Sequence, residues 1–281
     1  MKSSFLDIKN SSTFPLDKII GVLDWKDDFY SASYSRLIST SNQTQSSAIP
    51  VFLIDGKKHI PVVFGKEFDG KHFFDFGFES YDSFFKLIEK FSKTNFKRVA
   101  NPSYLETIFD EPLENRFSRT LYGLIPFIDG QNLDVFKFNK SNEDIQKTFY
   151  EIALASQELS DNDFINLDIH KGNIIKTVDS VVLVDSCLVP VYFRSRGDHI
   201  SDRNLYSHYS PEVCYGGLIT EKSQIYSVGA TFRNIISSEF DVFYETSSLW
   251  KKNRKIIASC LAKKPSKRPS SKELVGLLES L

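Results

Sequence analysis

The spacing of apolar residues changes near Gly130, and this change limits the folds that the chain can adopt. Upstream, short apolar runs are separated by turn residues, as in β-strands. Downstream, apolar residues recur at helical spacing. Strands followed by helices favour an α+β fold. We therefore expect a smaller β-rich part with one main helix and a larger, mainly helical part.

The β-rich part is predicted to contain a hairpin, one helix and two further strands. Apolar runs flank the turn signal Asp55-Gly56, which is typical of a β-hairpin over residues 51–68. Apolar residues at helical spacing predict a helix over residues 80–93. The further strands are predicted at residues 104–109 and 120–128.

The helical part is predicted to begin with an amphipathic helix over residues 143–159. Ser270 followed by Glu273 predicts a capping box at the start of the last helix. The remaining predicted elements are short strands at residues 173–177 and 180–185 and helices at residues 224–236, 249–262 and 270–281.

Composition and charge exclude several classes of protein. The 281 residues include 35 Lys and Arg against 36 Asp and Glu, so the net charge of −1 argues against binding nucleic acid through bulk charge. No apolar run approaches the roughly 18 residues of a membrane span, and the N-terminus lacks the apolar core of a secretory signal. The three cysteines lie far apart and form no zinc-binding spacing. We expect a cytoplasmic protein in a reducing compartment.

Three oxygen-bearing side chains are predicted to meet near the middle of the chain. Asp168 and Asn173 lie in a polar loop, and Asp185 ends an apolar strand. Because a tight turn joins the two predicted strands, Asn173 and Asp185 should lie at the same end of a hairpin. Their oxygens suit Mg²⁺, and the carboxylate of Asp168 can accept the proton of a hydroxyl nucleophile. Phosphoryl transfer requires this division of labour.

These residues belong to an ordered set of motifs that resembles the protein kinase superfamily. DIHKGN at 168–173 resembles the kinase catalytic loop, DSC at 185–187 stands where DFG is expected, and SPE at 210–212 resembles the APE motif. The stretches QIYSVG and CLAKKPSKRP, which begin at Gln224 and Cys260, are similar to the two kinase signatures that follow.

The resemblance implies a bilobal protein-kinase-like fold over residues 37–281. The N-lobe would cover residues 37–126 and the C-lobe residues 127–281, with residues 1–36 as an extension packed on or near the N-lobe. In the family, the arginine of the last signature pairs with the glutamate of APE. The resemblance therefore also implies a buried structural ion pair between the two residues that match them, Glu212 and Arg268.

The resemblance assigns roles to the candidate site residues. Asp168 would be the catalytic base, and Asn173 and Asp185 would hold Mg²⁺. His170 replaces the lysine of the kinase loop and would either stabilise the transferring phosphoryl group or only hydrogen-bond within the loop. The implied ATP-binding residues are Lys66 at the phosphates, Glu89 (or alternatively Glu79) as its ion-pair partner, and Phe127 and Ile128 at the hinge between the lobes.

The chain also departs from the kinase pattern. The predicted phosphate loop, residues 39–48, contains no glycine, and Phe64 stands where a small residue would face adenine. Asn166-Leu167 replaces the His-Arg pair before the catalytic aspartate, so activity should not depend on a phosphorylated activation loop. Gln224 replaces an aspartate that steadies the catalytic loop, although its amide can still accept a hydrogen bond.

Three functions are compatible with this pattern. The first is a divergent serine/threonine protein kinase that uses ATP and Mg²⁺, with a protein substrate favoured by the activation segment at 186–212. The second is a pseudokinase that acts as a binding or regulatory module with a protein partner. The third is a small-molecule phosphotransferase, suggested by His170 and Gly172. A compact chain of this kind is compatible with a viral or bacterial effector in a host cytoplasm.

Overall fold

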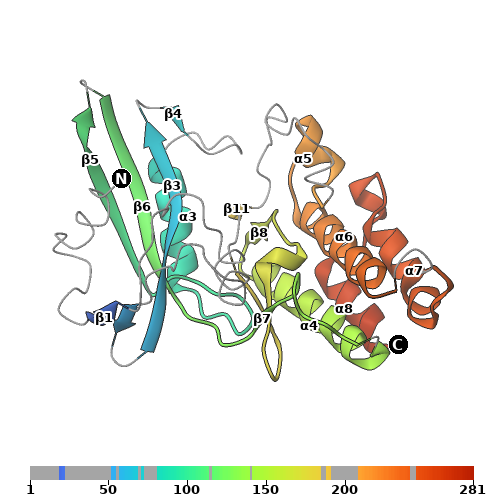
Figure 1. The fold of residues 1–281 in the computed structure, drawn as a ribbon. Coiled ribbons are helices and arrows are strands. Elements are labelled where there is room, and N and C mark those ends of the chain that lie inside the picture. The colour runs from blue at the N-terminus through green and yellow to red at the C-terminus, as the bar shows by residue number, and fades with distance from the viewer. Residues whose placement is uncertain are drawn as a thin grey trace. The chain divides into compact units, whose positions relative to one another are not determined.

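The computed structural model describes residues 19–22, 52–54, 57–68, 71–72, 81–113, 116–139, 141–184, 188–190, 208–240 and 245–281. Backbone contacts divide the chain into two units. The first unit consists of residues 1–95 and 100–129, and the second of residues 96–99 and 130–281. Strands dominate the described part of the first unit and helices that of the second (Figure 1), so the predicted α+β class is confirmed.

The first unit contains an antiparallel sheet with the strand order β1-β2-β3-β6-β5, and β4 pairs with β3. The predicted hairpin at Asp55-Gly56 is confirmed, because Ile54 and Lys57 pair across it. β5 and β6 are longer than predicted and meet in a second hairpin, where Leu113 pairs with Arg116. The strands are β1 (Ile19–Val22), β2 (Phe52–Ile54), β3 (Lys57–Phe68), β4 (Lys71–His72), β5 (Tyr104–Leu113) and β6 (Arg116–Pro126).

β1 is a strand that the sequence pattern does not indicate. It lies within the predicted extension of residues 1–36 and pairs with β2, so this part of the extension belongs to the sheet. The predicted phosphate loop at residues 39–48 lies outside the described residues.

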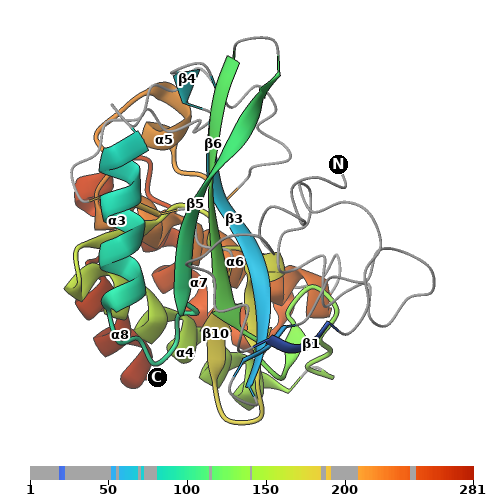
Figure 2. The ribbon, with the colours of Figure 1, turned by 90° about the vertical axis from the view of Figure 1, so that its left-hand side faces the viewer.

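The predicted helix near residue 80 is confirmed as α3 (Tyr81–Lys93), which packs beside β5 (Figure 2). Its apolar stripe buries Phe84, Ile88 and Phe91, while β6 buries Leu121 and Leu124. Each of these side chains stabilises the unit by about 1.5–3 kcal/mol when fully buried.

The second unit contains two small antiparallel sheets. One has the order β10-β9-β7, and in the other β11 pairs with β8. Residues 96–99 join this unit through a parallel bridge between Val99 and Leu183 and through Arg98, whose guanidinium binds Glu151 and Glu158. The strands are β7 (Gln131–Asn132), β8 (Phe164–Asn166), β9 (Ile174–Lys176), β10 (Val181–Leu183) and β11 (Leu188–Pro190).

α4 (Asn142–Asp161) packs against α6, α8, β8 and β10, and α7 packs against α6. Phe149 of α4 stacks on Phe232 of α6 with ring centroids 4.2 Å apart. Gly229 lets α6 approach α7 closely, because a Cβ atom there would lie 2.5 Å from Cβ of Cys260. The other helices are α5 (Pro211–Tyr215), α6 (Glu221–Phe240), α7 (Ser248–Cys260) and α8 (Ser271–Glu279), with 3-10 turns η2 (Lys171–Asn173) and η4 (Pro265–Lys267).

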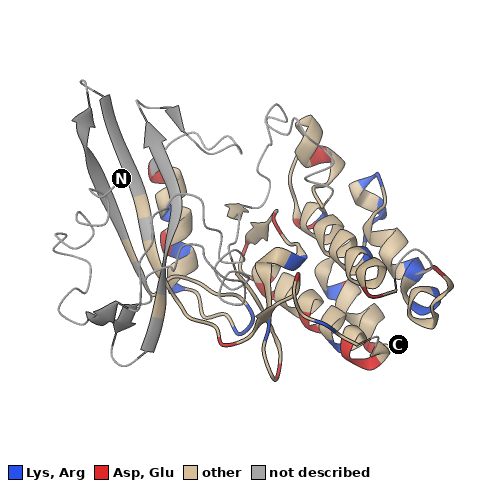
Figure 3. Ribbon diagram, viewed as in Figure 1, with Lys and Arg blue, Asp and Glu red and all other residues tan. Residues whose placement is uncertain are grey.

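The helix ends and faces follow the sequence pattern. The predicted capping box is present, since Ser270 accepts from the backbone of Glu273 and the Glu273 carboxylate accepts from the backbone of Ser270. α7 buries its apolar side and exposes a basic side that includes Lys251 and Lys255 (Figure 3). No helix within the described ranges is both long and apolar enough to span a membrane.

Candidate functional site

The predicted catalytic loop connects β8 to η2, and three side chains of α6 hold its backbone. Gln224 accepts a hydrogen bond from the Asn166 amide at 2.7 Å. Ser227 and Thr231, one and two turns further along α6, donate to the carbonyl oxygens of Leu167 (3.3 Å) and Ile169 (2.8 Å). The residues on both sides of Asp168 are therefore held by one rigid helix.

The prediction for Gln224 is confirmed, because its amide oxygen accepts from the loop backbone. The side chain is fully buried, and its Nε2 donates to the carbonyl oxygen and hydroxyl of Ser156 in α4 at 2.8 and 2.7 Å. A glutamine fits this position better than an aspartate, since the site contains acceptors that need a donor.

Replacing Gln224 with leucine should lower the free energy of unfolding by about 1–3 kcal/mol, because the Asn166 N–H would lose its acceptor in the interior. Replacement with glutamate should also destabilise, since a carboxylate would face the Ser156 carbonyl oxygen. Chemical denaturation measures the free energy of unfolding of both variants. Gln157→Leu, on the more exposed side of α4, is the control. Equal stability of all three would contradict the expectation.

Asp168 lies in the loop with both carboxylate oxygens engaged. Oδ1 is 2.7 Å from Nε2 of His208, and Oδ2 accepts from Nδ2 of Asn173 at 3.0 Å. Nε2 of His170 is 3.8 Å from Oδ2. Burial alone would raise the pKa of Asp168, but the His208 hydrogen bond and the nearby imidazoles outweigh it and hold this pKa below its ordinary value. The carboxylate is therefore ionised at neutral pH.

His170 makes the loop hydrogen bond that was one of its two predicted roles. Its Nδ1 accepts from the backbone N–H of Gly172 at 3.0 Å. In the neutral ring the proton must therefore sit on Nε2, the nitrogen nearest Asp168. Burial lowers the pKa of His170 and outweighs the attraction of Asp168, so the neutral form dominates at neutral pH. Its predicted role at a phosphoryl group stays a prediction.

Asn173 lies beside Val184, the residue before Asp185, while the meeting of Asn173 with Asp185 itself stays a prediction. Leu183 pairs with Ile174, and the backbone N–H of Val184 donates to the Asn173 carbonyl oxygen at 2.9 Å. The amide nitrogen of Asn173 faces Asp168, so its side-chain oxygen, which lies in the same plane, points in a different direction. An amide oxygen in that position is a donor type that Mg²⁺ accepts.

Asp185 itself lies outside the described residues. Within the part of the chain that the structure describes, no cluster of three or more His, Cys, Asp or Glu side chains could hold a metal ion. The predicted Mg²⁺ pair is of a different kind, because it uses an amide and Asp185.

The predicted nucleotide residues belong to the first unit. Lys66 lies on β3 opposite Thr120, but its side chain is outside the described residues, as is that of Phe64. Glu89 on α3 forms a partly exposed ion pair with Lys93, one turn away, at 2.7 Å. The predicted pair of Lys66 with Glu89 therefore stays a prediction.

Two further predicted nucleotide residues follow β6, and one alternative precedes α3. Phe127 and Ile128, predicted as the end of a strand, lie beyond it, because β6 ends at Pro126. Both side chains are half-buried. Glu79, the alternative partner of Lys66, lies outside the described residues.

Sequence reasoning missed two residues that shape the loop. Asn132 of β7 is fully buried, donates to the Gly172 carbonyl oxygen and accepts from the Asp134 amide at 2.9 Å. His208 lies two residues before the SPE motif. Neither residue belongs to a local pattern, and only the fold brings them to the loop.

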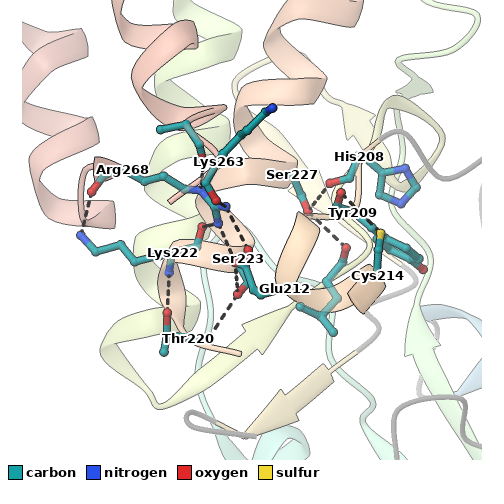
Figure 4. Close-up of polar contacts among 12 residues, drawn as sticks. His208, Tyr209, Glu212, Cys214, Thr220, Lys222, Ser223, Ser227, Lys263 and Arg268 are labelled. Atoms are coloured by element: carbon teal, nitrogen blue, oxygen red, sulfur yellow. Dashed lines mark hydrogen bonds and ion pairs between the residues drawn. The ribbon is translucent and has the colours of Figure 1, made fainter. Parts of the chain in front are cut away.

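The predicted ion pair between Glu212 and Arg268 is confirmed. It is bidentate, with Nη1 to Oε1 at 2.6 Å and Nη2 to Oε2 at 2.9 Å (Figure 4). Arg268 also donates to the carbonyl oxygens of Ala262 and Lys222, and Ser223 donates to Glu212 at 2.7 Å. Burial alone would raise the pKa of Glu212, but the Arg268 hydrogen bond lowers it below its ordinary value.

Comparison with known proteins gives no family assignment. No protein-family model matches the chain, and no curated protein matches its sequence.

Proposed function

We propose that the chain is a divergent protein kinase that transfers the γ-phosphate of ATP to serine or threonine hydroxyls of a protein. The supporting observation is the convergence of Asp168 and Asn173, with Asn173 donating to Oδ2 of an ionised Asp168 in a loop that α6 holds on both sides. A carboxylate fixed in this way suits a catalytic base, because positioning contributes most of the catalysis of phosphoryl transfer.

The division into a strand-rich and a helix-rich unit supports the bilobal kinase-like fold that accompanies this proposal. The division between Asp129 and Gly130 is three residues from the predicted lobe boundary after Pro126. The Glu212–Arg268 pair supports the same fold, since it joins the residues that match two separate kinase motifs.

In the proposed reaction, Asp168 orients the substrate hydroxyl and accepts its proton. His170 directs a neutral N–H from Nε2 toward the same region and would stabilise the transferring phosphoryl group. Lys66 would bind the ATP phosphates. Asn173 and Asp185 would hold Mg²⁺, which supplies positive charge to the phosphate oxygens.

A protein substrate is favoured by the position of the SPE segment. Tyr209 hydrogen-bonds Asp168, and the backbone at His208 is anchored to α6, so this segment adjoins the proposed base. Residues that flank the acceptor hydroxyl would therefore contact the segment. A free sugar or antibiotic would use little of it.

The test is incubation of purified protein with γ-labelled ATP and Mg²⁺, alone and with a generic protein substrate, beside Asp185→Ala. Label on protein with the wild type and not with the variant is the expected result. Equal labelling by both would remove Asp185 from the site. Label on a small molecule and none on protein would indicate a small-molecule phosphotransferase instead.

A pseudokinase with a regulatory protein partner is the second candidate, favoured by the absence of glycine from residues 39–48. The absence of labelling, together with no rise in melting temperature on adding ATP and Mg²⁺, would favour this second function.

A further inference from the structure

His208 makes the shortest described contact to the proposed catalytic base. Its Nε2 lies 2.7 Å from Asp168 Oδ1, and its side chain is 9% exposed. The two atoms are at hydrogen-bond distance, and a carboxylate accepts hydrogen bonds whereas an imidazole has a ring N–H to donate. The proton of this hydrogen bond therefore belongs to His208, whose Nε2–H donates to Asp168.

The scaffold fixes the backbone on both sides of this contact. The Ser227 hydroxyl contacts the carbonyl oxygen of His208 at 2.8 Å (Figure 4) and that of Leu167 at 3.3 Å. One side chain of α6 thus links the segment that carries His208 to the residue before Asp168. Because both segments share this anchor, the imidazole and the carboxylate are held at hydrogen-bond distance.

The contacts of Asp168 distinguish its two oxygens. Oδ1 is taken by the buried His208, whereas Oδ2 faces Asn173 at 3.0 Å and His170 Nε2 at 3.8 Å. The described contacts to Oδ2 are therefore longer than the 2.7 Å contact to Oδ1, and Tyr209 also hydrogen-bonds the carboxylate.

We propose that His208 is a positioning residue that holds Oδ1 of Asp168 and so presents Oδ2 to the acceptor hydroxyl, an inference that rests on the proposed kinase function. His208 also ties the segment before the SPE motif directly to the catalytic base. This contact would order the segment before the SPE motif. In kinases an arginine that binds the phosphorylated activation loop does this, and Leu167 stands in its place here.

The kinetic test compares His208→Leu, which has no donor, with His208→Gln, whose amide N–H can still reach Asp168. His208→Leu should lower kcat by about 10²-fold, as expected for a misplaced catalytic group, with the KM for ATP unchanged. The kcat of His208→Gln should be about tenfold higher than that of His208→Leu, because a hydrogen bond to a charged group is restored. A kcat equal to wild type in His208→Leu would overturn the proposal. So would equal loss in both variants when their melting temperatures match wild type.

A spectroscopic test does not depend on turnover or on the folding of the leucine variant. The wild type should show a slowly exchanging imidazole N–H proton by NMR, assigned through its loss in His208→Gln, and Asp168→Ala should abolish it. Persistence of that signal in a folded Asp168→Ala would overturn the proposal. If the signal behaves as expected but the wild type transfers no phosphate, the contact stands and the kinase function fails.

Discussion

Replacing Asp168 with asparagine should lower the rate of Mg²⁺-dependent phosphoryl transfer by about 10²- to 10⁴-fold, the usual contribution of a general base. Asparagine keeps the size of the side chain and can still accept from His208, but it cannot take up the hydroxyl proton. The KM for ATP should change little, because Asp168 is proposed to act on the acceptor hydroxyl and not on the nucleotide. Initial rates with γ-labelled ATP measure both parameters.

Asp179→Asn is the matched control for Asp168→Asn. Asp179 is exposed in the turn between β9 and β10 of the same unit, so the same loss of charge there should leave the rate unchanged. The expectation fails if Asp168→Asn keeps the wild-type rate while Asp185→Ala loses it. That result would retain the metal site and remove the proposed base.

Replacing Arg268 with methionine should lower the free energy of unfolding more than the Gln224 substitutions do. The guanidinium is fully buried and the Glu212 side chain is 10% exposed. Removing one partner leaves the other charge without compensation, which costs about 3–5 kcal/mol and lowers the melting temperature by about 6–20 °C. Calorimetry of the variant measures the change, and Lys267→Met, an exposed neighbour, should stay within about 0.5 kcal/mol of wild type.

A double variant separates the cost of the orphaned charge from the value of the pair. Glu212→Gln combined with Arg268→Met leaves no buried charge unpaired, so it should be more stable than Arg268→Met alone. A double variant less stable than the single one would show that the remaining hydrogen bonds of Glu212 matter more than its charge.

The same pair gives the stability a pH dependence of known sign. The pKa of Glu212 in the folded chain lies below the ordinary value of 4.5, because the Arg268 hydrogen bond outweighs burial. The folded state thus binds this proton less readily than the unfolded state. The contribution of Glu212 is fully present above pH 4.5 and is lost as the pH falls through the folded pKa. Arg268→Met should reduce this acid-dependent loss.

Local patterns predicted most of the described helices and the first hairpin. α3 and α4 followed from apolar spacing, the start of α8 from the Ser270 capping box, and the β2–β3 hairpin from Asp55-Gly56. These features depend on neighbours within a few residues, so the sequence contains their full signal.

Residues that act across the fold were predicted only where the family resemblance named them. Gln224 and the Glu212–Arg268 pair were found through matched motifs, whereas His208 and Asn132 were not. The partners of His208 and Asn132 lie 40 residues away in the chain. Only tertiary packing brings such partners together, and a lone histidine or asparagine has no periodicity that would reveal it.

The placement of residues 96–99 has a consequence for dissecting the molecule into fragments. These residues bridge β10 through Val99 and bind α4 through Arg98, yet the chain on both sides of them belongs to the other unit. A polypeptide starting at Gly130 would lack them, leaving Glu151 and Glu158 without their cation and Leu183 without its bridge. A separate tetrapeptide with the sequence of residues 96–99 would lose entropy on binding, and this loss would oppose the restoration of these contacts. The helical unit is therefore best produced as part of the whole chain.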